Sequence, residues 1–304
     1  MKVALVGGCG YLGSWLAERL IQEGHSVLSI HRSPRHEFST EVQCLQINAA
    51  NLDVITSALK DFDALVLLDS KNIMNQRPIN PLENQSFRTV SWAIVEGLPR
   101  TQIRKIVFLS SGGALYDLRD PNKPATEEAE ITINSNYAME KIHYENFLSD
   151  FRAKNPPFAI TCARISNVYG PSIHGIRPRG LITKALEAAL WSKKLSVYGL
   201  YDVRDYVYAH DVVDFLSLAI AKTPSNFILN VGSGIGISNQ QVIELIETYT
   251  QTSIGYMSFP RLEHAPRINI IDSSVAKEVL GWTPKTSFND GLEKVIQTWT
   301  TSSL

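Results

Sequence analysis

Tyr137 and Lys141 are the residues whose types and spacing first point to chemistry. They stand four apart in "NYAMEK" (136–141), a stretch that otherwise has the composition of a helix. Four-residue spacing puts both side chains on one helix face, so a phenol and an ammonium meet on one turn. Most pairs of this kind are solvated surface contacts. Whether the Tyr137–Lys141 pair belongs to a functional site depends on the other motifs in the chain.

A glycine-rich loop near the start of the chain indicates a second kind of chemistry. In "GGCGYLG", Gly7, Gly10 and Gly13 lie between an apolar run and an amphipathic run. The first two let the backbone turn tightly and approach a pyrophosphate, and the last lets the helix pack against the strand. The free N–H groups of the helix start would then face the phosphates. The pattern predicts dinucleotide binding; a tight turn with no cofactor is the alternative.

Strands alternate with helices along the first half of the chain. Apolar runs predict strands at 3–7, 26–32, 42–48, 63–69, 105–111 and 158–166, and helical spacing predicts helices at 14–24, 54–62, 85–98 and around Tyr137. This alternation is typical of a parallel, doubly wound α/β sheet. The second half is less regular, and we expect helices at 181–194, 238–251 and 288–300 with strand-to-loop junctions between them.

Composition excludes several classes of protein. The chain has 304 residues, of which 44% are hydrophobic and 19% charged, as in ordinary globular proteins. A net charge of −1 gives no footprint for nucleic acid or an anionic membrane, and no apolar run is long enough to span a bilayer. Cys9, Cys44 and Cys162 are odd in number and widely spaced. They suggest neither a disulfide framework nor a metal site, so we expect a reducing cytoplasm.

Seven motifs occur in an order that resembles the extended short-chain dehydrogenase/reductases, the nucleotide-sugar epimerase/dehydratase family. They are "GGCGYLG", "VFLSSGGALY", "YAMEK", "ARISNVYGP", "VRDYVYAHD", "NVGSG" and "LGWTPKTSFNDGL". The resemblance implies a Rossmann-type NAD(P)-binding domain over 1–166 and about 205–232. It also implies a smaller C-terminal substrate-binding lobe over about 167–204 and 233–304, and a nucleotide-diphosphate sugar as substrate.

The resemblance gives the opening pair a role. It implies that Tyr137 is the acid/base and that Lys141 assists it and bonds the nicotinamide ribose. An ordinary phenol has a pKa of about 10, and a nearby cation favours the phenolate. The third member should be a Ser or Thr ending the fifth strand. The position many relatives use is Gly112 here. Because "SSGGALY" resembles a glycine-rich subgroup of the family, we expect Ser111 in this role, with Ser110 as the alternative and as a cofactor contact.

The end of the second predicted strand bears on the choice of nicotinamide. NAD sites usually carry an acid there, whereas "SIHRSPRH" has His31, Arg32 and Arg35 and no acid. A guanidinium can bind a 2′-phosphate, so NADP(H) is favoured and NAD remains possible. Asn48 would face the adenine. The other expected cofactor contacts are Gly7, Gly10, Tyr11, Leu12 and Gly13 in the glycine loop, together with Tyr137 and Lys141.

The remaining motifs imply where a substrate would bind. By resemblance, Asn167 would lie near the sugar or diphosphate, and Arg204 of "RDY" would bind the diphosphate. Arg261 and Arg267 lie where the family often has further diphosphate contacts, but the sequence around them matches the family only loosely. Each arginine could instead make a surface salt bridge.

Two enzymatic functions fit these residues. One is a nucleotide-sugar epimerase acting by transient oxidation at C4, and the other is an NADPH-dependent 4-ketoreductase. A 4,6-dehydratase fits less well, because Gly113 and Ala114 stand where such relatives carry an Asp-Glu pair. A non-catalytic NAD(P)-binding module is the remote alternative. By resemblance, the helices at 85–98 and 137–153 would form a homodimer.

Overall fold

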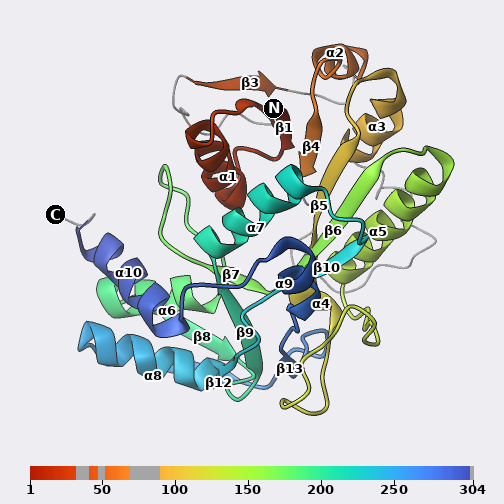
Figure 1. The fold of residues 1–304 in the computed structure, drawn as a ribbon. Helices are drawn as coiled ribbons and strands as arrows, with labels where there is room; N and C mark the ends of the chain where they lie inside the picture. Colours follow the sequence, from red (N-terminus) through yellow and green to blue (C-terminus); the bar gives the residue numbers. More distant parts are fainter. Residues whose placement is uncertain (32–40, 47–51, 69–89, 302–304) are drawn as a thin grey trace. The chain divides into compact units, whose positions relative to one another are not determined.

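The computed structural model describes residues 1–31, 41–46, 52–68 and 90–301 (Figure 1). The chain divides into two compact units, each assembled from several segments. Unit one comprises residues 1–110, 135–164 and 213–229, and unit two comprises 111–134, 165–212 and 230–304. Residues 111–134, 165–166, 205–212 and 230–232 thus group with unit two, although we expected them in the first domain.

A seven-stranded sheet forms the centre of the first unit, in the order β10–β6–β5–β4–β1–β2–β3. The pairings of β1 with β2 and β4, of β2 with β3, and of β4 with β5 are all parallel. This confirms the Rossmann-type α/β class. The bounds are β1 Lys2–Val6, β2 Ser26–His31, β3 Val42–Gln46, β4 Ala64–Leu67, β5 Lys105–Ser111, β6 Ala159–Ile165 and β10 Ile228–Val231.

Helices cover both faces of this sheet, and central strands such as β1 and β4 are accordingly apolar and buried over most of their length. Figure 1 shows α1 (Tyr11–Gln22) and α7 (Ala209–Lys222) side by side on one face. An ion pair between Arg19 and Asp214 joins these two helices, with 3.0 Å between its N and O atoms. The opposite face packs against α2 (Leu52–Ala58), α3 (Val90–Gly97) and α5 (Asn136–Lys154) in one apolar core.

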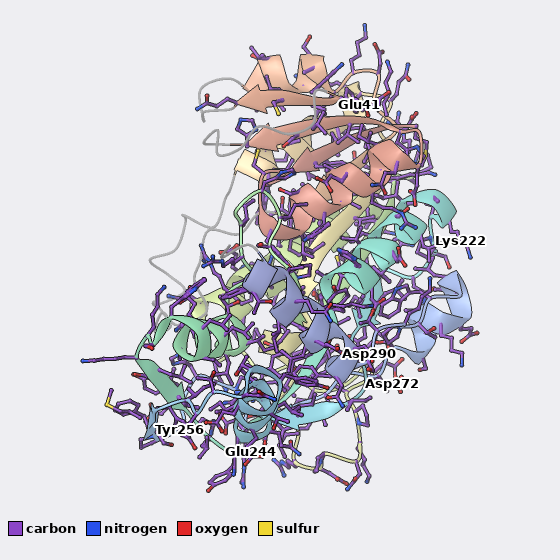
Figure 2. All side chains as sticks on the ribbon, turned by 90° about the vertical axis from the view of Figure 1, so that its left-hand side faces the viewer. Glu41, Lys222, Glu244, Tyr256, Asp272 and Asp290 are labelled. Carbon is purple, nitrogen blue, oxygen red and sulfur yellow. The ribbon has the colours of Figure 1, made fainter. Side chains whose placement is uncertain are left out.

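Unit two contains smaller sheets and its own core. A four-stranded sheet joins β7, β9, β11 and β13, and a parallel pair joins β8 and β12. Side chains of α6, α8 and α10 bury a second apolar cluster. At its surface, Figure 2 marks Glu244 on α8 and Tyr256 on β12. The bounds are β7 Asn167–Tyr169, β8 Leu195–Tyr198, β9 Val203–Tyr208, β11 Gly236–Ser238, β12 Tyr256–Phe259, β13 Ile268–Asn269, α4 Gly112–Leu115, α6 Leu181–Trp191, α8 Asn239–Thr250, α9 Ser274–Leu280 and α10 Phe288–Thr301.

Candidate active site

The glycine loop joins β1 to α1 by a turn that needs glycine. Gly7 has φ +85°, in the left-handed region, and its N–H donates to the Ile30 carbonyl at 2.9 Å. A Cβ added at Gly13 would lie 2.5 Å from the Gly7 carbonyl oxygen and 2.6 Å from that of Gly8. Only glycine therefore lets the first turn of α1 pack this closely on the loop.

Gly8 is a second constrained position, which the sequence analysis did not single out. A Cβ there would lie 2.5 Å from the Ser29 Oγ of β2. The doubled glycine in "GGCG" was the available signal. The loop thus lies directly against the second strand as well as the first.

The start of α1 suits an anionic ligand. Gly10 caps the helix without a side-chain hydrogen bond, and the first turn has no acidic residue. Tyr11 and Leu12 open the helix, so this segment gathers the glycine-loop residues expected to bind cofactor. A glycine-rich cradle at a helix N-terminus fits the pyrophosphate of a dinucleotide.

The end of β2 carries His31, one of the residues expected to bind the adenosine ribose. The side chain is buried, and its Nδ1 has no hydrogen-bond partner among the described residues. Burial lowers the pKa of His31, so the imidazole is neutral at pH 7 and supplies no charge for a phosphate. Arg32, Arg35 and Asn48, expected to bind the same part of the cofactor, lie outside the described residues.

Tyr137 and Lys141 lie on the first two turns of α5. The helix begins after Ser135, whose Oγ accepts a hydrogen bond from the Ala138 N–H at 3.1 Å. The Lys141 Nζ is 5.5 Å from the Tyr137 ring centroid. It also donates to the Leu109 carbonyl of β5 at 2.7 Å, and the Lys141 residue is only 3% exposed. A buried ammonium excludes the solvated surface pair.

The two serines that end β5 differ in their partners. Ser110 Oγ donates to the Glu145 carboxylate, and both residues are buried. Ser111 is the last residue of β5 and caps α4, but its side chain makes no capping hydrogen bond. Within the described part of the chain, no hydrogen bond engages the Ser111 hydroxyl. Ser111 is thus the serine whose hydroxyl is open to another partner.

In unit two, Asn167 lies beside the glycine turn that follows Ser111. Its Nδ2 donates to the Asp205 carbonyl at 3.2 Å and lies 3.5 Å from where a Cβ on Gly113 would be. The buried Asp205 carboxylate accepts hydrogen bonds from the Ser233 N–H and hydroxyl at 2.8 and 2.7 Å. Burial raises the pKa of Asp205, and the bonds from Ser233 oppose that rise.

The three arginines expected at a diphosphate gather in the same unit. Arg204 Nη2 lies 3.3 Å from the Asp202 carboxylate, and its Nη1 donates to the Arg267 carbonyl at 3.3 Å. Burial raises the pKa of Asp202, while Arg204 and Arg261 both oppose the rise, which places both near this carboxylate. Arg267 is exposed, and the Arg261 guanidinium donates to the Ala265 carbonyl. The structure therefore pairs Arg204 with Asp202, whose pKa Arg261 also lowers, and it brings only the backbone carbonyl of Arg267 to this cluster.

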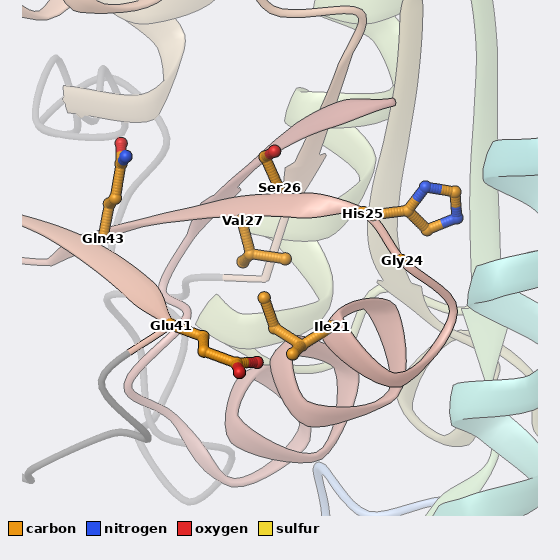
Figure 3. Close-up of a pocket in the computed structure, with 7 residues that line it drawn as sticks. All are labelled: Ile21, Gly24, His25, Ser26, Val27, Glu41 and Gln43. Carbon is orange, nitrogen blue, oxygen red and sulfur yellow. The ribbon is translucent and has the colours of Figure 1, made fainter.

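A pocket of about 320 Å³ opens at the other end of the sheet (Figure 3). It is lined by Ile21, Gly24, His25, Ser26, Val27, Glu41 and Gln43. Ser26 and Val27 are the first residues of β2, so the pocket lies at the amino end of the strand. Ligands of doubly wound sheets bind at the carboxyl ends, and this pocket is therefore separate from the candidate active site.

Comparison with known proteins establishes the family. The model of the NAD dependent epimerase/dehydratase family matches residues 3–232, which is most of the chain. The protein belongs to the NAD-dependent epimerase/dehydratase family. Membership confirms the resemblance drawn from the seven motifs and places the chain in a family of enzymes. No helix among the described residues is long and apolar enough to cross a membrane.

Relatives span more than one reaction. The UDP-glucose 4-epimerase of Mycolicibacterium smegmatis is 28% identical over 98% of each chain. The dTDP-4-dehydro-6-deoxyglucose reductase of Escherichia coli is 24% identical over 97% of this chain and 96% of that protein. A solved UDP-glucose 4-epimerase of Thermus thermophilus, in complex with NAD, matches with a TM-score of 0.86, 21% identity and 99% of each chain. At that identity, the structural match concerns the fold.

Proposed function

We propose that this protein is a nucleotide-sugar epimerase that acts by transient oxidation at C4 of the sugar. The observation that carries the proposal is the buried Lys141 ammonium, which lies by the Tyr137 ring and bonds the Leu109 carbonyl. A fixed cation beside a phenol favours the phenolate, the form a general base requires. The 4-epimerase among the relatives, similar over nearly the whole chain, supports this reaction.

The proposed chemistry divides among few residues. Tyr137 takes the proton from the sugar hydroxyl and later returns it, while Ser111 hydrogen-bonds the same oxygen. Lys141 places a positive charge beside the Tyr137 ring, 5.5 Å from its centroid. The nicotinamide, when bound, takes a hydride from the sugar carbon and gives it back. Rotation of the keto-sugar before the return step exposes its other face and inverts the carbon.

The substrate contacts in the proposal come from unit two. Asn167 would bond the sugar or diphosphate, and Arg204, Arg261 and Arg267 would supply the positive charge that a diphosphate needs. The positions of Arg204 and Arg261 by Asp202 support this assignment for those two, and Arg267 enters it through the family resemblance.

We propose that the chain prefers NADP(H) over NAD(H). The support is the run that follows His31 at the end of β2, where Arg32 and Arg35 stand and no acid takes the usual place. The solved relative in complex with NAD favours the alternative. Arg32→Asp should shift the preference toward NAD; an unchanged ratio of the two affinities would contradict the NADP(H) assignment.

A 4-ketoreductase is the second candidate, favoured by the basic run after β2 and by the reductase among the relatives. One experiment separates the candidates. The protein is purified without added cofactor, denatured, and any released nicotinamide is identified, and UDP-, dTDP- and GDP-hexoses are then assayed for C4 inversion. Stoichiometric oxidised cofactor together with inversion supports the epimerase. An empty protein that consumes NADPH with a 4-keto sugar indicates the reductase, and cofactor binding without turnover indicates a non-catalytic module.

The proposal includes a homodimer and a cytoplasmic location. Trp92 of α3 and Phe147 of α5 stack with ring centroids 3.9 Å apart, and both remain partly exposed. An aromatic pair of this kind suits a helix-to-helix interface. Cys9, Cys44 and Cys162 are free thiols, which suits a reducing compartment.

A further inference from the structure

Four polar residues are buried beneath the end of β5. Lys141 and Glu145 lie on consecutive turns of α5, Arg164 lies on β6, and Ser110 lies on β5. The Glu145 carboxylate accepts hydrogen bonds from Arg164 Nε at 3.0 Å and Arg164 Nη2 at 2.7 Å. It also accepts the hydroxyl of Ser110. One carboxylate thus joins the helix to two strands.

This cluster ties α5 to β5 at two consecutive residues. Lys141 donates to the Leu109 carbonyl, and Glu145, one turn further along, receives Ser110. Tyr137 lies one turn before Lys141 on the same helix face. The two ties therefore fix where the strand ends relative to the turns that carry Tyr137 and Lys141.

Stability alone is a weak reason to bury these charges. Replacing a buried ion pair by apolar residues of similar volume is often neutral or stabilising. Hydrogen bonds, however, have preferred lengths and directions, so they constrain position more narrowly than apolar contact does. The buried polar cluster therefore fixes the position of the end of β5 more precisely than apolar packing would.

We propose that Glu145 and Ser110 are positioning residues of the active site. Glu145, oriented by Arg164, holds Ser110, and Ser110 in turn fixes the strand end from which Ser111 follows. The inference rests on the proposed function, from which it takes the roles of Tyr137 and Ser111. It also leaves Ser110 without a proton to donate to a substrate oxygen, because its hydroxyl donates to Glu145.

The test compares two serines that each donate to a glutamate. Ser110→Ala removes the bond to Glu145, whereas Ser217→Ala removes the bond from α7 to Glu23, 2.6 Å long. We expect Ser110→Ala to lower kcat about 10- to 100-fold with KM changed less than about threefold, since small misplacement of reacting groups is costly. Ser217→Ala should keep the wild-type kcat. Ser110→Thr, which keeps the hydroxyl, should recover most of the loss.

A double-variant cycle separates positioning from direct contact. Glu145→Asp keeps the charge near Arg164 but withdraws the carboxylate from Ser110. If Ser110 acts only through Glu145, the double variant loses no more kcat than Ser110→Ala alone. Losses that multiply would show that Ser110 acts on the substrate itself, and would overturn the inference.

Hydrogen exchange gives a readout independent of turnover. Amides at 108–113 should exchange faster in Ser110→Ala than in wild type or Ser217→Ala. If the wild-type protein inverts no nucleotide sugar, the proposed function fails, and the exchange data still decide the inference. Equal exchange in the two alanine variants would overturn it.

Discussion

The buried Lys141 ammonium makes Tyr137 the sharpest residue to test. Tyr137→Phe removes one hydroxyl, and we expect kcat to fall about 10²- to 10⁴-fold, the usual contribution of a general acid/base. Cofactor binding should persist, because the glycine loop is untouched. Steady-state kinetics and cofactor titration check both expectations.

Tyr201→Phe is the matched control for this substitution. Tyr201 is 75% exposed, so its variant should retain wild-type kcat. Turnover by Tyr137→Phe within about threefold of the control would rule out the acid/base role and return the non-catalytic module to consideration.

At the residue scale, spacing predicted the pair on α5 but not its surroundings. The four-residue interval placed Tyr137 and Lys141 on one face, since helix geometry is local. Glu145 and Arg164 were not singled out, because their ion pair depends on how α5 packs against β6. The sequence around Ser110 and Ser111 does not distinguish the two serines. They differ only because packing brings Glu145 to Ser110.

At the scale of elements, the junction of β1 with α1 depends on Gly13. Gly13→Ala would bring a methyl group to 2.5 Å from the Gly7 carbonyl oxygen, which neither backbone segment can avoid cheaply. We expect a loss of about 1–3 kcal/mol in unfolding free energy, as for other overpacked sites, together with weaker cofactor binding. Urea denaturation and cofactor titration measure the two effects.

Gly255→Ala provides the comparison, because a Cβ at Gly255 meets no atom within 4 Å. Its unfolding free energy should stay within about 0.5 kcal/mol of wild type. If the two variants are equally stable, the close packing inferred for Gly13 is wrong.

Asp205 joins separate segments of unit two. Its carboxylate accepts N–H groups of Ser233, Gly234 and Ile271 as well as the Ser166 hydroxyl. Asp205→Asn places an amide NH₂ among these donors, so we expect a loss of about 1–3 kcal/mol of unfolding free energy. Asp214→Asn, which breaks the partly exposed pair with Arg19, should cost less than about 1 kcal/mol. Similar losses in both variants, measured by urea denaturation, would contradict this ranking.

The helices of three or more turns were predictable from sequence, and the strands of two or three residues were not. The observed α8 spans Asn239–Thr250 and α10 spans Phe288–Thr301, each within two residues of its predicted bounds. Apolar periodicity over three or more turns is a strong local signal. By contrast, β11 and β13 have three and two residues, too few to show alternation. Helix α1 begins at Tyr11, earlier than expected, because the glycine loop itself supplies its first turn.

At the scale of the whole molecule, the proposed dimer is directly measurable. Sedimentation should give about twice the chain mass of 33.9 kDa. Phe147→Glu should yield monomers, because a carboxylate on the α5 face opposes association. Tyr249→Glu, at an exposed position of α8, should leave the mass unchanged. A wild-type monomer, or a dimer that survives Phe147→Glu, would contradict the assigned interface.

The two units are interleaved along the chain, and this determines which truncated forms of the protein can fold. The polypeptide passes from one unit to the other after residues 110, 134, 164, 212 and 229, so neither unit is a continuous stretch of sequence. A fragment that stops anywhere before residue 229 lacks part of both cores. During synthesis, therefore, segments of unit two emerge between the segments of unit one, and unit one is complete only once residue 229 has been made. A premature stop codon even two-thirds of the way along should leave an unfolded product that proteases remove, with no autonomous half surviving.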